Sequence, residues 1–418
     1  MSEPELINPV PADEVEAWTR ALVTTLLGNP YEDDFPRHVS RWARDWLPDR
    51  AWAFRDRGRL IATLVTEPRN VTVPGFGPAT HDVEVDALTG VSVAATHRRR
   101  GLLTQMITQS LQAAKDRGDP LSMLIAAEWP IYGRYGYAPA VDNARYTYFP
   151  RRPFGALPPA AAGSVRQVEA AELGETARTI FDAARRLRSG QVDRRGPWWD
   201  RRLSLDGYEK IGPQPNWVLH DGPDGPDGLL AWKVTRDFEL DGTLGALEVS
   251  DFVTATDEAY RDLWGYLSGI DVIDEISLPA RPVDEPIRWQ LKDGRALKHT
   301  GTGDLLWLRL LDVPAALSLR GYAVPGRLVL DVVDEDLGRF GAGRVLLEAS
   351  DVRAQCRPTD DAPDLRLSQR ALASIYLGGH RLREISFSGG VEELSPGALD
   401  RADVMFATPL APWTQTGF

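Results

Sequence analysis

The sequence predicts a mixed α/β (α+β) protein in which two similar α/β units stand in tandem and a third, smaller α/β unit follows. A hairpin followed by strand, helix and strand occurs in the first 150 residues and again between about 217 and 278. The stretch FPRRPFGALPPAAAG at 149–163 is rich in Pro and small residues and separates the two copies. New strands begin near residue 302, so we expect domains at 1–150, 151–301 and 302–418.

Hydrophobic periodicity predicts the elements of the first unit. Apolar residues at helical spacing indicate a helix over 12–27, and a hairpin over 51–65 turns at Arg57-Gly58. A strand over 83–93 precedes a helix that starts near Leu102 and ends at Gly118, and the apolar run LSMLIAA follows. Two strands that flank a helix in this way are expected to lie parallel in one sheet.

The second unit repeats this order, and the third has its own strands. We expect a hairpin over 217–234, a strand over 246–253, a helix over 257–268 and a strand near 276. The segments WLRLLDV, LVLDVVD and RVLLEAS predict strands of the third unit, with helices near 313–317 and 369–377 and an extended tail.

Composition excludes several classes of protein. The chain has 418 residues, and its 48 Lys and Arg against 60 Asp and Glu give a net charge of −12. A single cysteine, Cys356, rules out an intramolecular disulfide and a Cys-rich zinc site, and we interpret it as a buried structural thiol. The six histidines are scattered without metal-binding spacing, so we expect no metal.

The charge and the start of the chain bear on partners and location. An acidic protein repels nucleic-acid phosphates, so we expect no nucleic-acid partner. The acidic start MSEPEL is unlike a signal peptide, and no apolar run reaches the ~18 residues of a membrane span. We therefore expect a cytoplasmic protein with no membrane partner. The charge of −12 either attracts cationic amines such as polyamines and amino sugars or serves solubility alone.

The strongest chemical signal is VSVAATHRRRGLLTQ at 91–105, where a strand ends and Arg98-Arg99-Arg100-Gly101 opens a helix. A helix start presents unpaired N–H groups and the positive end of the dipole, which suits a phosphate or pyrophosphate. Gly101 lets a ligand approach the backbone closely. The alternative is a solvated basic helix start.

This motif resembles the acetyl-CoA signature of the GNAT superfamily of N-acetyltransferases. Four further segments, IYGRYGYAPA, WWDRRL, LWLRLLDVPAALSLRGYA and IYLGGHR, together resemble the Eis (enhanced intracellular survival) family along essentially the whole chain. The resemblance implies two GNAT-like domains, a C-terminal sterol-carrier-like domain and a homo-oligomer, usually a hexamer. It also implies acetylation of several amines on one aminoglycoside, with acetyl-CoA as co-substrate.

The resemblance also assigns roles to residues of this chain. Val91 and Val93 correspond to the strand that pairs with the pantetheine arm. The pyrophosphate turn corresponds to Arg98, Arg99, Gly101, Leu102 and Leu103. The central copy has Thr256, Asp257, Glu258 and Ala259 at this place, and its acids would repel pyrophosphate. We therefore expect one acetyl-CoA site per chain, in the first domain.

Two catalytic groups are implied in the same way. Tyr132 corresponds to the general acid, since a phenol of pKa near 10 stays protonated at pH 7 and can donate to a departing thiolate. The main-chain carboxylate of Phe418 corresponds to the buried C-terminal carboxylate. This carboxylate serves either as a base, directly or through water, or as an anchor for the substrate cation.

The acceptor pocket is where the chain departs from the family. Asp33, between Glu32 and Asp34, and the residues Trp42, Trp199 and Asp293 correspond to pocket positions, although both tryptophans could instead be core. Gly417 replaces a frequent acid and Gly90 a frequent aromatic residue, so we expect lost substrate contacts and more open space.

These departures leave more than one function open. The first is acetylation of polycationic amines such as aminoglycosides, and the second is acetylation of polyamines or of lysine and peptide amines. A third, from another class, is a CoA-binding structural or regulatory protein with little turnover. A lipid carrier would need an apolar tunnel within 302–418.

Overall fold

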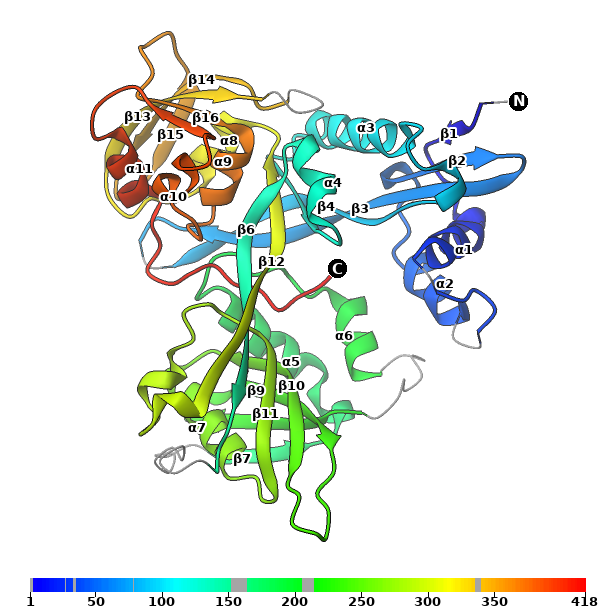
Figure 1. Cartoon of the computed structure of the whole chain (residues 1–418), viewed down its shortest axis with the longest axis vertical. Coiled ribbons are helices and arrows are strands. Elements are labelled where there is room, and N and C mark those ends of the chain that lie inside the picture. The colour runs from blue at the N-terminus through cyan, green and yellow to red at the C-terminus, as the bar shows by residue number, and fades with distance from the viewer. Residues whose placement is uncertain are drawn as a thin grey trace.

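A computed structural model describes residues 3–26, 28–32, 35–77, 79–151, 164–204, 214–334 and 340–418. Two sheets organise this part of the chain: one of twelve strands and one of five (Figure 1). No helix among these residues is long and apolar enough to cross a membrane. Within the same ranges no group of three or more His, Cys, Asp or Glu could hold a metal ion.

The first unit contains the predicted hairpin, helix and strands. Its elements are β1 (Glu5–Ile7), α1 (Val15–Thr25), α2 (Phe35–Ala43), β2 (Ala51–Asp56), β3 (Arg59–Pro74), β4 (Thr80–Val93), α3 (Leu102–Asp116), β5 (Leu121–Ile125), α4 (Trp129–Tyr132) and β6 (Ala138–Tyr148). Strands β4 and β5 pair in parallel across α3, as expected for a strand–helix–strand unit. The buried face of α3, with Met106, Ile107 and Leu111, packs on this half of the sheet.

The second unit repeats this arrangement. Its elements are β7 (Ser164–Val168), α5 (Ala170–Arg185), α6 (Gly196–Leu203), β8 (Asn216–Gly222), β9 (Gly225–Arg236), β10 (Gly245–Thr254), α7 (Asp257–Ser268) and β11 (Ile273–Arg281). Strands β10 and β11 pair in parallel across α7, just as β4 and β5 do across α3. The tandem fold predicted from the sequence is therefore confirmed.

One strand lies differently from our expectation. Strand β12 (Leu297–Leu310) contains the segment that we predicted to open the third unit, but it inserts between β5 and β6 of the first unit. The order of the large sheet is β1-β2-β3-β4-β5-β12-β6-β11-β10-β9-β8-β7. Because β6 also pairs with β11, the two units share one continuous sheet, and a boundary at 302 falls inside a strand.

The third unit has a separate sheet with order β15-β14-β13-β16-β17. Its elements are α8 (Val313–Leu319), β13 (Gly326–Val333), β14 (Gly343–Ala349), β15 (Ala354–Pro358), β16 (Leu365–Ser368), α9 (Gln369–Ile375), α10 (Leu382–Ser386), β17 (Val391–Glu393) and α11 (Ala398–Phe406). Cys356 is buried on β15, which confirms a structural thiol, and burial raises its pKa to about 12. After α11 the chain leaves this unit as an extended tail and ends between the first two units (Figure 1).

Arg309 on β12 ties the third unit to the loop that follows α4. Its guanidinium donates to the Tyr135 carbonyl and to Asp334 Oδ2, at 2.9 Å, and both charged side chains are fully buried. Gly136, at φ 78°, lets the guanidinium approach, because a Cβ there would overlap Arg309 Nη1. The loop that directly follows Tyr132 is thus held by a strand formed about 170 residues later.

Replacing Arg309 with Met should lower the free energy of unfolding by about 3–5 kcal/mol, because the Asp334 charge would remain buried without its partner. The double variant Arg309→Met/Asp334→Leu should recover most of this loss, since it removes both charges. Urea denaturation followed by tryptophan fluorescence measures both values. A single variant as stable as the parent protein would show that this pair does not hold the units together.

Candidate functional site

The candidate site is a split between β4 and β5. The two strands pair from Asp86–Ser122 to Leu88–Leu124, and beyond that point β4 pairs only with β3 within the described residues. The Ala94 N–H donates to the Ile61 carbonyl on β3 at 2.8 Å. Because successive amides of a strand point to opposite sides, the Val93 N–H faces the split. The backbone of Val91 and Val93 is thus available to a ligand that enters there.

The turn between β4 and α3 suits an anion. Gly101 precedes the first helical residue with φ 79°, Arg99 has φ 62°, and no side chain caps the helix. The first N–H groups of α3 therefore remain open to a ligand. His97 fixes the turn, since its Nε2 lies 3.2 Å from Asp56 Oδ2. Helix α7 differs, because Thr256 caps it by accepting from the Ala259 N–H and acids follow in its first turn.

All seven predicted cofactor residues lie around one cleft of about 520 Å³. They are Val91, Val93, Arg98, Arg99, Gly101, Leu102 and Leu103. Tyr132 from α4 lines the same cleft. The structure thus brings the end of β4, the start of α3 and α4 together, as one acetyl-CoA site would require.

The three neighbouring tyrosines have different environments. The Tyr135 hydroxyl lies 3.1 Å from Thr104 Oγ1, and the Tyr137 hydroxyl lies 2.7 Å from Ser122 Oγ. The Tyr132 hydroxyl has no hydrogen-bond partner among the described residues. Burial raises the pKa of Tyr132 to about 12, and Tyr135 and Glu128 act in the same direction. Among the described residues, Tyr132 is thus the one of these three tyrosines whose hydroxyl is not engaged by another side chain.

The tail ends where β4 and β5 separate. Thr89, the residue of β4 after the last parallel pair, donates its hydroxyl to the Phe418 main-chain oxygen at 3.3 Å. Ile125, the residue of β5 after that pair, is the group nearest to a Cβ added at Gly417, at 4.0 Å. The C-terminal carboxylate therefore lies at the base of the split, and Gly417 leaves the expected open space.

The second unit holds the tail in place. The Trp413 N–H donates to the Ser189 carbonyl at 3.0 Å. Arg194 donates from Nε to Thr416 Oγ1 at 3.1 Å and from Nη2 to Asp251 at 2.7 Å. Arg194 and Asp251 are almost fully buried, so the last residues of the chain rest on an ion pair inside the second unit.

A second pocket, of about 430 Å³, lies beside the tail and is the candidate acceptor site. Trp42, Trp46 and Trp198 line it. Two residues that bind the tail also lie next to this pocket: Thr89 is opposite Val65 of the pocket wall in the sheet, and the Arg194 guanidinium lies 4.1 Å from the Trp198 ring. Its charged lining residues are Arg41, Arg44, Arg69, Arg195, Arg201, Asp45 and Glu67.

Only one of the predicted acceptor residues that the structure describes lines this pocket. Trp42 lines this pocket, although it also packs edge-on against Trp18 in the core. Trp199 is buried among α5, α6 and β9 and does not line it, whereas Trp198 does. Asp293 caps a turn at the start of β12, about 30 Å along that strand from its pairing with Ile125. Asp33 lies outside the described residues.

Our expectation for Gly90 was wrong, because no open space lies beside it. A Cβ at Gly90 would come within 2.5 Å of the Trp18 ring, which fills that side of β4. The backbone there has φ 59° and bulges out of the β3–β4 pairing. Gly90 therefore accommodates Trp18 and a local distortion of the strand.

Sequence reasoning missed Thr89, Arg194 and Trp198. Thr89 and Arg194 matter only through their contacts with a tail more than 200 residues away, which no local pattern signals. The pair Trp198-Trp199 can be recognised in the sequence, but only the phase of the helix determines which of the two rings faces the core.

Comparisons with known proteins agree with this geometry. The chain matches two family models described as acetyltransferase (GNAT) domain, at 7–140 and 190–310, and one described as sterol carrier protein domain, at 313–415. It is 37% identical over 421 residues to an uncharacterized N-acetyltransferase of Streptomyces griseus, covering 97% of this chain and 98% of the relative.

Two Eis proteins are similar along their whole length. N-acetyltransferase Eis of Mycobacterium tuberculosis is 32% identical, covering 95% of this chain and all of the relative. The crystal structure of Eis1 from Mycobacterium abscessus superposes with a TM-score of 0.84 at 30% identity and covers both chains fully. The chain therefore belongs to the Eis family of GNAT N-acetyltransferases.

Proposed function

We propose that this N-acetyltransferase moves the acetyl group of acetyl-CoA to a primary amine in the split between β4 and β5. The observation that carries the proposal is the meeting of three parts there: the uncapped start of α3, the Tyr132 phenol and the chain's own C-terminus. GNAT enzymes use acetyl-CoA, which supplies an activated acetyl thioester. The α3 turn would hold its pyrophosphate, and Val91 and Val93 its pantetheine arm.

In the proposed reaction one group in the split donates a proton to the departing thiolate, and another accepts the proton of the amine. The amine attacks the thioester carbonyl, and the Val93 N–H, which faces the split, is placed to donate to the developing oxyanion. Tyr132 gives its proton to the departing CoA thiolate. The Phe418 carboxylate accepts or relays the proton of the amine, or binds its cation, and Thr89 fixes its position.

Two acceptor classes have support. The resemblance to the Eis family and the net charge of −12 favour polycationic amines such as aminoglycosides, or polyamines. The pocket beside the tail favours an amine that also carries an acidic group, because more arginines than carboxylates line it. Arg69 pairs with Glu67 at 2.5 Å, and its buried Nη1 lies 4.0 Å from Asp193 Oδ1, an ion-pair contact without a hydrogen bond.

We also propose that the protein is cytoplasmic and forms a homo-oligomer, a hexamer by family resemblance. Large apolar side chains that are mostly exposed support subunit contacts, among them Trp289 and Phe387. Light scattering coupled to size exclusion gives the subunit number directly.

Release of CoA thiol from acetyl-CoA over a panel of acceptors tests the proposed reaction. The panel contains several aminoglycosides, spermidine, a lysine peptide and glutamate. Turnover with any amine supports acetyl transfer, and the preferred member decides between the two acceptor classes. Acetyl-CoA binding without turnover on any amine would instead favour a structural or regulatory role.

Replacing Tyr132 with Phe should lower kcat on the order of 100-fold while the Kd for acetyl-CoA changes less than about twofold, because the ring remains and only the proton donor is lost. Tyr135→Phe is the matched control, since its hydroxyl is bound to Thr104. Equal losses in the two variants would argue against a specific role for Tyr132.

The pH dependence of kcat offers an independent check. A general acid works while protonated, and the pKa of Tyr132 is raised to about 12. The rate should therefore show no alkaline fall caused by this group up to about pH 10. A Tyr132-dependent fall centred near 9 would contradict its role as a buried acid.

A further inference from the structure

The segment 188–195, which lies between α5 and α6 in the chain, joins the tail to the sheet of the first unit. On one side it is bound to β3: the Thr72 N–H donates to the Gln191 carbonyl at 2.9 Å, and the Gly190 N–H donates to the Thr72 carbonyl at 2.8 Å. On its other side it binds the tail from Ala411 onward. The second unit thus supplies a support for the tail that is itself tied to β3.

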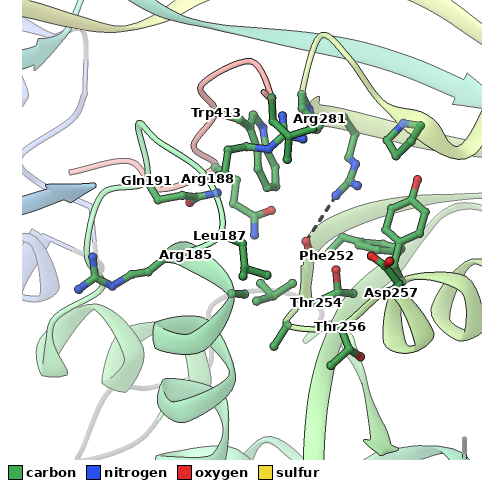
Figure 2. A pocket seen from close by; sticks show the side chains of 18 of the residues that line it. Arg185, Leu187, Arg188, Gln191, Phe252, Thr254, Thr256, Asp257, Arg281 and Trp413 are labelled. Carbon is green, nitrogen blue, oxygen red and sulfur yellow. Dashed lines mark hydrogen bonds between the residues drawn. The ribbon is translucent and has the colours of Figure 1, made fainter. Parts of the chain in front are cut away.

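The second unit first binds the tail at Ala411. Arg188 Nη1 donates to the Ala411 carbonyl at 2.8 Å, and the Ala411 N–H donates to Asp284 Oδ2 at 2.9 Å. Arg188 and Asp284 also pair with each other at 2.6 Å. Further along, the Arg281 guanidinium lies 5.2 Å from the Trp413 ring, and this ring and Arg188 line a pocket of about 620 Å³ (Figure 2). The tail is therefore held by its backbone and by a side chain.

Arg194 makes the hydrogen bond with the second unit that lies nearest to the C-terminus among the described residues. Its Nε donates to Thr416 Oγ1 at 3.1 Å, and its Nη2 donates to Asp251 Oδ1 at 2.7 Å. The Arg194 side chain is 1% exposed, and Thr416 is fully buried. Because an extended chain spans at most about 7 Å over two residues, this contact confines the Phe418 carboxylate to a small region.

Three elements of the second unit fix the Arg194 guanidinium. Its Cζ lies 4.3 Å from the centre of the Phe181 ring on α5 and 4.1 Å from that of the Trp198 ring on α6. Asp251 on β10, which pairs with Arg194, also accepts from Arg202 Nε at 3.0 Å. The planar guanidinium is therefore held by rings and by a carboxylate, and its Nε points in one direction.

The last link of the tail is flexible. Gly417 stands between Thr416 and Phe418, and glycine has the most permissive backbone of any residue. The Thr89 hydroxyl meets the Phe418 main-chain oxygen at 3.3 Å, which is long for a bond of this kind. Thr89 thus holds one end of a flexible link, and Thr416 has to hold the other.

We propose that Arg194 is a positioning residue for acetyl transfer, which through Thr416 sets the place of the Phe418 carboxylate in the split. This inference rests on the proposed function, in which that carboxylate takes up the proton of the amine or binds its cation. Arg194 acts through the tail and not by contact with acetyl-CoA. The second unit, whose helix start is capped by Thr256, thereby serves the reaction of the first.

The variant Thr416→Val tests the proposal, because it removes the acceptor for Arg194 at nearly equal size and leaves the Arg194–Asp251 pair in place. We expect kcat for CoA release, with the amine of the panel that is turned over fastest, to fall about tenfold, since a small displacement of a reacting group is costly. The Kd for acetyl-CoA should change less than about twofold, which also shows that the variant is folded.

Two further variants serve as controls. Thr416→Ser keeps the hydroxyl and should retain most of kcat. Thr408→Val makes the same chemical change earlier in the tail, where the hydroxyl donates to the Leu410 carbonyl at 2.8 Å, and it should leave kcat unchanged. A loss in Thr408→Val equal to that in Thr416→Val would overturn the proposal, because the contact with Arg194 would then have no special effect.

A double-mutant cycle with the C-terminal amide separates positioning from a purely structural role. In a semisynthetic protein whose Phe418 carboxylate is an amide, Thr416→Val should lower kcat less than about twofold further, because the group that it positions has already lost its charge. An equal fall on both backgrounds would overturn the role of Arg194. So would a parent-like kcat of Thr416→Val, and if the amide alone lowered kcat the proposed reaction would still stand. No turnover of any amine by the parent protein would instead count against the proposed function itself.

Discussion

The insertion of β12 between β5 and β6 is the constraint on which the site depends. Leu306 pairs with Ile125 on one side and Val141 on the other, so the first unit's sheet is completed only by a strand that follows the second unit. The same strand carries Arg309, which binds the Tyr135 carbonyl in the loop after α4 and the Asp334 carboxylate. Folding therefore requires pairing between segments far apart in sequence, and the three units are not independent modules.

The two related clefts differ through a few residues at the start of one helix. In the first unit a glycine in the left-handed region precedes α3 and leaves its N–H groups uncapped, with arginines alongside. In the second unit Thr256 caps α7 and two acids follow. The same topology thus leaves the helix start open in one copy and capped in the other, because helix capping decides whether the N–H groups at the dipole end are available.

Local patterns predicted most of the elements and the cofactor turn, since periodicity and the RRRG helix start act over a few residues. The helix over 257–268 and the hairpin over 51–65 agree with the structure for this reason. Such local patterns do not predict contacts between segments that are far apart in the sequence. The place of β12, the Trp18 ring beside Gly90 and the Arg194–Thr416 contact each depend on segments that meet only in the folded chain. Phe418 was assigned from family resemblance alone, and Thr89 supplies its physical support.

The proposed reaction depends most on the tail, because Phe418 ends where β4 and β5 separate and the second unit anchors the residues before it. The most direct measurement is kcat of a semisynthetic protein whose C-terminal carboxylate is a primary amide. The amide keeps the size and the contact with Thr89 but removes the charge. We predict a fall in kcat on the order of 100-fold with the Kd for acetyl-CoA unchanged. Turnover equal to that of the unmodified protein would contradict a role of the carboxylate in acetyl transfer.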